Sequence, residues 1–137
     1  MNRFTILYAA ILIAGPASTN AQSSSESSDV RAEFPECPAR IRVLGEPPGD
    51  PIECLCTPEI RQIEGTVKLY GSGPYDSVSN ICIAAVHAGV TTLEGGPVRV
   101  IPRPPQSSFK GTLANGVYSE DWSSSKFNTF DVEPVKN

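Results

Sequence analysis

The single histidine is the residue whose chemistry most readily suggests catalysis. His87 is the only ordinary candidate for a general base near neutral pH. A Ser–His–Asp site needs a serine on an exposed turn, and the sequence holds no Gly-x-Ser-x-Gly motif. His87 instead ends an apolar segment just before Gly89, where an imidazole can bond terminal helix carbonyls and favour the negative end of the helix dipole. The sequence therefore predicts structural roles for His87 and Gly89 and no catalytic residue.

Adjacent carboxylates are the other feature that could do acid–base chemistry. Glu120 and Asp121 precede Trp122, and a glycosidase needs two carboxylates that face each other across a sugar. Neighbouring residues on a strand point to opposite faces, so this pair does not provide that geometry. The spacing of the acidic residues also matches no EF-hand loop. We therefore expect no enzyme activity, no metal and no cofactor.

Four cysteines, Cys37, Cys54, Cys56 and Cys82, form an even set in a chain that we expect to be exported. An oxidising compartment favours two disulfides. Cys54 and Cys56 are too close in sequence to join each other without strain. The residues alone leave two pairings open, 37–54 with 56–82 or 37–56 with 54–82. A zinc site is disfavoured, because Cys-x-Cys with one histidine is poor zinc spacing.

Five basic residues are candidates for binding an anionic ligand. Residues 39–44 alternate and predict a strand that places Arg40 and Arg42 on one face, and neighbouring segments supply Arg99, Arg103 and Lys110. Clustered together, they would hold a phosphate or an acidic polysaccharide. The alternative is a set of solvated strand residues, because exposed arginines are common. The formal net charge of −4 argues against a nucleic-acid partner.

Exposed aromatic side chains would indicate carbohydrate stacking instead. The candidates are Tyr75, Tyr118 and Trp122, although such residues more often pack beneath turns.

We expect the chain to consist of a signal peptide, a leader, one domain and a short tail. Residues 1–21 read as a signal peptide, with Arg3, an apolar run of h-region length, and a small-residue cleavage site before Gln22. Removing them takes the formal net charge from −4 to −5. Residues 22–33 form a Ser-rich flexible leader, residues 34–132 the domain and residues 133–137 a polar tail. No later segment is long and apolar enough to cross a membrane.

Thirteen Pro and 11 Gly exclude a helical bundle and favour a turn-rich α+β fold. We expect a short helix that begins at Thr57-Pro58-Glu59 and ends at Gly65, and a strand over 66–70. Residues 76–89 predict a helix, about 77–88, capped by Ser77 or Ser79 and ended by Gly89. This helix is apolar nearly all round, so strands at 98–101, 108–112, 117–118 and 127–132 should enclose it. Asn115-Gly116 predicts a tight turn.

The residues around this helix resemble the LCCL domain family. The sequence Tyr75-Asp76-Ser77-Val78-Ser79-Asn80-Ile81-Cys82-Ile83-Ala84-Ala85-Val86-His87-Ala88-Gly89-Val90, followed by Gly95-Gly96-Pro97-Val98-Arg99-Val100, carries the family pattern. The resemblance covers roughly Cys37 to Phe130. It implies a central helix wrapped by two small β-sheets. It also implies the disulfides Cys37–Cys54 and Cys56–Cys82.

The resemblance also bears on function, because some LCCL-containing proteins are linked to lipopolysaccharide recognition. We predict a non-enzymatic exported binding module, periplasmic or secreted, for an anionic ligand such as lipopolysaccharide, a lipid head group or an acidic glycan. The alternative is a protein–protein interaction module, for instance a small periplasmic inhibitor, an accessory subunit or a binder of another envelope protein.

Overall fold

The computed structural model describes Gly15 and residues 33–41, 49–123 and 126–137. The expected signal peptide and Ser-rich leader therefore lie outside the described residues, apart from Gly15 and Glu33, and so does Arg42. Within the described part, no helix has the length and apolar character needed to cross a bilayer.

Helix α3 (Ile81–His87) is the centre of the fold, and all seven of its residues are buried. Its N-cap is Asn80, whose Oδ1 accepts a hydrogen bond from the Ile83 backbone N–H at 3.0 Å. Gly89, at φ 73°, ends the helix as predicted.

The expected helix start at residue 77, with Ser77 or Ser79 as the cap, is wrong. Asp76 belongs to strand β2 (Tyr75–Asp76), and Ser79 Oγ accepts a hydrogen bond from the Tyr70 N–H at 3.0 Å. The chain therefore remains extended or in a turn up to Asn80. The residues before Asn80 are held by contacts with distant parts of the chain, and the apolar pattern of the sequence does not reveal such contacts.

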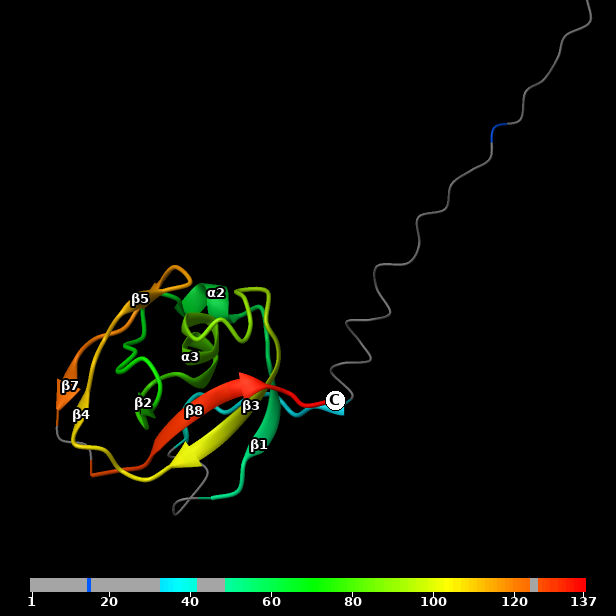
Figure 1. Ribbon diagram of the computed structural model, residues 1–137. Helices are drawn as coiled ribbons and strands as arrows, with labels where there is room; N and C mark the ends of the chain where they lie inside the picture. The colour runs from blue at the N-terminus through cyan, green and yellow to red at the C-terminus, as the bar shows by residue number, and fades with distance from the viewer. Residues whose placement is uncertain (1–14, 16–32, 42–48, 124–125) are drawn as a thin grey trace, which may run out of the picture.

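One four-stranded antiparallel sheet covers α3. It contains β1 (Ile52–Cys56), β3 (Gly96–Arg103), β8 (Thr129–Pro134) and β2 in the order β1-β3-β8-β2. Val98, Val100 and Phe130 are fully buried in it. Figure 1 shows β3 and β8 side by side beneath α3, with β1 to their right.

Two short ribbons close the other side of the fold. Strand β4 (Ser108–Phe109) pairs with β7 (Trp122–Ser123), and β5 (Leu113–Ala114) pairs with β6 (Val117–Tyr118). Asn115 and Gly116 have φ values of 49° and 78°, which gives the predicted tight turn. The α+β class and the enclosed central helix are confirmed. The enclosure in the described residues is one sheet and two ribbons, not two sheets.

Four expected elements differ from the structure. Residues 39–41 are not in a strand, because the Ala39 carbonyl accepts a hydrogen bond from the Ile81 N–H and Ile41 enters the core. Residues 66–70 provide only one bridge, from Tyr70 to Glu120. Strand 108–112 ends at Phe109, since the Gly111 and Thr112 N–H groups bond side chains instead. The last strand, β8, runs into the predicted polar tail.

The short helix was predicted in the right place with the wrong cap. Helix α2 (Ile60–Ile63) is followed by Gly65 at φ 73°, as expected. Its N-cap is Glu59, whose side chain makes no capping hydrogen bond to the helix; the Thr57 and Pro58 carbonyls instead accept the N–H groups of Ile60 and Arg61.

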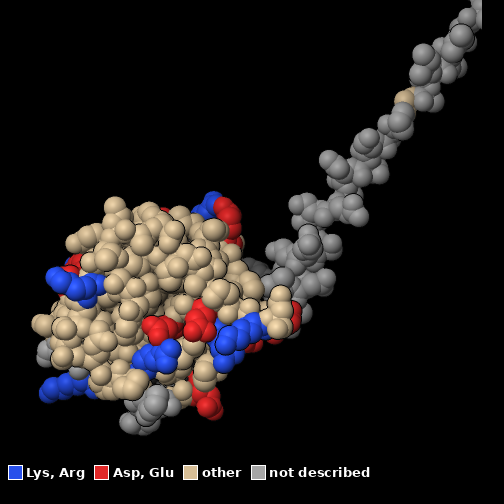
Figure 2. All heavy atoms as spheres, in the orientation of Figure 1, with Lys and Arg blue, Asp and Glu red and all other residues tan. Residues whose placement is uncertain are grey.

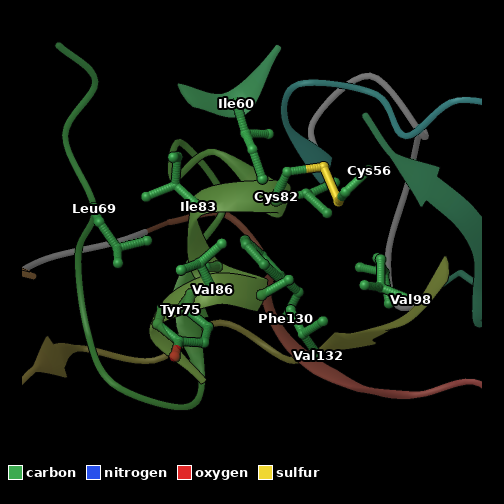
Figure 3. Close-up of a cluster of buried hydrophobic side chains, with 14 of the residues drawn as sticks. Cys56, Ile60, Leu69, Tyr75, Cys82, Ile83, Val86, Val98, Phe130 and Val132 are labelled. Atoms are coloured by element: carbon green, nitrogen blue, oxygen red, sulfur yellow. A yellow bond between two sulfur atoms is a disulfide. The ribbon is translucent and has the colours of Figure 1, made fainter. Parts of the chain in front are cut away.

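The disulfides join the central helix and the chain entry to β1. Cys37 is bonded to Cys54, and Cys56 to Cys82, which confirms the pairing implied by the family resemblance. Figure 3 shows the Cys56–Cys82 bridge beside Ile60, at one end of the cluster of buried side chains around α3.

Candidate functional site

His87 is enclosed by neutral partners. Its side chain is 2% exposed, its Nδ1 lies 2.8 Å from the Tyr75 hydroxyl, and its Nε2 lies 3.2 Å from the Thr112 carbonyl oxygen. A neutral imidazole with its proton on Nε2 satisfies both contacts, because Tyr75 then donates and Thr112 accepts. The Asn115 side-chain amide donates a hydrogen bond to the backbone carbonyl of His87 at 2.8 Å. The amide, and not the imidazole, therefore makes the expected contact with a carbonyl at the end of the helix.

The two adjacent carboxylates have separate cationic partners. Lys110 Nζ donates to Asp121 at 2.8 Å, and the Gly111 N–H donates to the other Asp121 oxygen, also at 2.8 Å. The Lys110 hydrogen bond, followed by the Gly111 one, lowers the pKa of Asp121 below its ordinary value. Glu120 accepts two hydrogen bonds from Lys68. The pair is thus engaged in two different surface contacts.

Three of the five predicted anion-binding cations already have carboxylate partners. Arg99 donates to Glu53 at 3.1 Å, Arg103 to Asp131 at 2.8 Å, and Lys110 to Asp121. On the face shown in Figure 2, most basic side chains likewise lie against acidic ones. A ligand binding here would have to displace those carboxylates, so these three residues form no open basic patch.

Arg40 has a different environment. It lines a cleft of about 320 Å³ together with Lys68, and the remaining lining residues are Ala39, Val67, Val78 and Asn80. Among the residues that the structure describes, no carboxylate forms an ion pair with Arg40. Two cations therefore meet at one partly apolar cleft, which we call the Arg40 cleft.

Sequence reasoning did not single out Lys68 as a site residue. The alternation of residues 66–70 could have placed Lys68 on the face opposite Val67 and Leu69. Its proximity to Arg40 depends on contacts between segments distant in sequence.

A second depression shares Val67 and Lys68 with the Arg40 cleft. This Tyr118 groove has a volume of about 500 Å³. It is lined by the segment 64–69, Ile83, the segment 116–118 and Glu120. Tyr118 is 69% exposed, whereas Tyr75 is buried and Trp122 packs on Tyr70 with ring centroids 4.8 Å apart. Of the three predicted stacking residues, Tyr118 lines this groove, and Trp122 is 43% exposed elsewhere on the surface.

Lys68 lines both depressions, and its ion-pair partner Glu120 lines the Tyr118 groove. Lys68 Nζ lies 2.7 and 3.1 Å from the two Glu120 carboxylate oxygens, and this contact raises the pKa of Lys68. Both side chains are solvent-accessible, so the pair is weak and its members can exchange partners. Arg40, Lys68 and Tyr118 together offer two hydrogen-bonding cations and one aromatic surface.

Comparison with known proteins identifies the family. The LCCL domain family model matches residues 36–129, more than half of the chain. Human cochlin is 47% identical over 60 residues, which cover 42% of this chain and 11% of cochlin. Clotting factor C of Tachypleus tridentatus is 37% identical over 73 residues, covering 53% of this chain and 7% of that protein. The chain thus spans a small part of these relatives' lengths, and it belongs to the LCCL domain family.

Proposed function

We propose that this chain is an exported, non-enzymatic binding module that holds an anionic group of an extracellular saccharide or lipid head group in the Arg40 cleft. Export rests on the signal-peptide pattern of residues 1–21. Similarity to a chicken protein named as a cysteine-rich secretory protein, 42% identical over 53 residues, supports the same compartment.

The proposal rests on the observation that Arg40 and Lys68 line the same cleft. Arg40 is exposed, and its guanidinium can donate two parallel hydrogen bonds to a phosphate or carboxylate. Lys68 lines the same cleft and supplies a second cation once an anionic ligand displaces its exposed partner Glu120. Val67 and Val78 provide apolar wall, which strengthens charged contacts by excluding water.

The Tyr118 groove extends this site for a saccharide. Because Val67 and Lys68 line both depressions, a ligand whose acidic group lies in the Arg40 cleft can continue past Lys68 into the groove. There an exposed tyrosine ring offers a flat apolar surface, and Glu120 offers an acceptor for sugar hydroxyls. The shared ligand chemistry is therefore an anionic group attached to a sugar.

Binding measurements on the full oxidised chain test the proposal. The panel is lipopolysaccharide, a polyuronate and neutral dextran, each at low and moderate salt. We expect saturable, salt-sensitive binding to at least one anionic ligand and none to dextran. Arg40→Gln should weaken it about tenfold, since a hydrogen bond to a charged group contributes about 1.5–3 kcal/mol.

Arg103→Gln is the matched control, because it removes the same charge from an exposed arginine that is paired with Asp131. It should leave the affinity unchanged. The lipopolysaccharide and polyuronate arms distinguish a lipid-linked phosphate from a sugar carboxylate. Equal weakening by both substitutions, salt-independent binding, or no binding to any anionic ligand by the folded protein would contradict the proposal.

A protein partner is the second candidate, favoured by the outer face of the β5–β6 hairpin. Leu113 and Tyr118 are directly opposite each other across the ribbon and are 71% and 69% exposed. Affinity capture from the envelope should then retain a defined protein that the variant Leu113→Ser releases. Capture unchanged by Leu113→Ser would contradict this candidate.

A further inference from the structure

The segments 68–70 and 118–122 lie side by side at the surface. They meet in a parallel bridge between Tyr70 and Glu120. Successive residues of an extended chain point to opposite faces. Ser119 is 0% exposed and faces the interior, whereas the side chains at 118, 120 and 122 are all at least partly exposed. These three side chains therefore share the outer face.

Two side-chain contacts repeat on this face, two residues apart on both segments. Lys68 donates to Glu120 at 2.7 Å, and the Tyr70 ring contacts the Trp122 ring with centroids 4.8 Å apart. Tyr118 lines the same groove as Lys68 and Glu120. The five side chains thus form one strip of surface, with a charged pair between aromatic residues. We call this surface the aromatic strip.

The aromatic strip offers a ring at each end. Tyr118 is 69% exposed at one end and Trp122 is 43% exposed at the other. Phe109 lies opposite Trp122 and Leu113 opposite Tyr118, so the two ribbons keep one register along the strip. At a rise of about 3.4 Å per residue, four residues of extended chain cover about 14 Å. A ligand that reaches both rings is therefore longer than one sugar or one phosphate group.

The middle of the strip suits groups that both donate and accept hydrogen bonds. The Lys68 ammonium is a donor, and the Glu120 carboxylate is an acceptor. Sugar hydroxyls do both, and a sugar ring also has an apolar C–H face that can pack on an aromatic ring. A phosphate lacks the apolar face, and an alkyl chain lacks the hydroxyls. The chemistry of the strip therefore favours linked sugars.

We propose that the aromatic strip binds a chain of several linked sugars that continues from the anionic group in the Arg40 cleft. The inference rests on the proposed function, and it narrows the ligand to an anionic saccharide chain instead of an isolated phosphate or head group. Lys68 joins the two sites, because it lines both the Arg40 cleft and the Tyr118 groove. The sugars pass over Tyr118 and Glu120 and end on Trp122. Affinity should therefore grow with chain length until Trp122 is covered.

Trp122 is the only tryptophan of the chain and gives a direct readout of this contact. The full oxidised chain is titrated with two ligand pairs while Trp122 emission and its quenching by acrylamide are recorded. One pair is a disaccharide and an octasaccharide of galacturonate, and the other is lipopolysaccharide without and with its O-polysaccharide. Acrylamide should quench the emission of the free chain, because Trp122 is partly exposed. In at least one pair, the longer ligand should bind more tightly and protect Trp122, and the shorter one should leave it open to acrylamide.

Two variants at one position separate ring contact from chain length alone. Calorimetry measures the affinity of each variant for both members of a pair, and circular dichroism checks that each variant is folded. Trp122→Leu should weaken the longer ligand several-fold and leave the shorter one unchanged, so that the length preference is lost. Trp122→Phe is the matched control, because it keeps an aromatic ring and should retain most of the preference. Arg40→Gln should weaken both members.

The outcomes distinguish this inference from the proposed function. Equal affinities for both members, with Trp122 unprotected and binding still weakened by Arg40→Gln, would overturn the aromatic strip as a binding site and leave the Arg40 cleft supported. A length preference that Trp122→Leu does not change would also overturn it, because a longer chain can gain affinity simply by offering more anionic groups. Failure of the folded chain to bind any of the four ligands would contradict both proposals.

Discussion

The Tyr75 hydroxyl lies 2.8 Å from Nδ1 of His87, and both side chains are almost fully buried. The two rings are also perpendicular, with centroids 5.7 Å apart. This contact joins β2 to the last turn of α3, and Thr112 continues it from the other ring nitrogen to the chain just before β5. A polar chain thus crosses the apolar core from the main sheet to a ribbon.

Removing the hydroxyl should destabilise the fold. Tyr75→Phe leaves Nδ1 of His87 buried without a donor, and an unsatisfied buried polar group costs about 1–3 kcal/mol. Urea denaturation at neutral pH measures the change in unfolding free energy. Tyr118→Phe is the matched control, because its ring is 69% exposed, and it should change stability little. Equal effects of the two substitutions would contradict the importance of the Tyr75–His87 contact.

Stability should fall in strongly alkaline solution. Burial, and then the negative charge of Asp131, raises the pKa of Tyr75 from 10.0 to about 12. Between these two values the unfolded chain loses the phenol proton while the folded chain keeps it, so rising pH favours unfolding. The contribution is fully present below pH 10 and is lost as the pH rises toward about 12. Urea midpoints across this window should drop more steeply for the wild-type chain than for Tyr75→Phe, and parallel curves would argue against the assignment.

The helix cap can be located by substitution. Asn80→Ala removes the side-chain acceptor of the Ile83 N–H and should cost about 1 kcal/mol. Ser77→Ala is the contrasting variant, since Ser77 Oγ is buried without a hydrogen-bond partner among the described residues. Its removal should be neutral or stabilising, because an unsatisfied hydroxyl is lost. A larger loss for Ser77→Ala than for Asn80→Ala would place the cap at the serine.

Each disulfide should contribute comparably to stability. The bridges separate cysteines by 17 and 26 residues, and a loop of this size corresponds to about 3 kcal/mol in the chain-entropy model. The double variants Cys37→Ser/Cys54→Ser and Cys56→Ser/Cys82→Ser remove one bridge each without leaving a free thiol in that pair. Their unfolding free energies should differ from each other by less than either differs from wild type. Loss of folding in only one of them would show that one bridge carries an additional packing role.

The sequence predicted the elements whose signals are local. The apolar run through Ala84 and Ala85 and the terminal Gly89 defined the central helix, and Asn115-Gly116 defined the hairpin turn. The N-terminus of α3 was predicted at the wrong residue, because Ser77, Ser79 and Asn80 lie close together and each can serve as an N-cap. The choice of Asn80 depends on the pairing of Asp76 with Thr129, which lies far along the chain.

Pairing between strands that are distant in sequence also explains why only part of the candidate site was predicted. Arg103 meets Asp131 only because β3 lies next to β8, and Arg99 meets Glu53 only because β3 lies next to β1. The sequence does not show which strands lie next to each other. An arginine with a carboxylate partner therefore could not be distinguished from one without. Residues 66–70 alternate because Val67 and Leu69 reach the core, although their backbone forms no ladder.

The Cys56–Cys82 bridge also restricts how two copies of the chain can associate. Domain swapping requires one element to leave its own fold and take the same place in a neighbour. In the oxidised chain α3 is covalently attached to β1, and β1 is attached through Cys54 to the chain entry at Cys37. The helix therefore cannot be donated to another molecule without taking β1 and the chain entry with it.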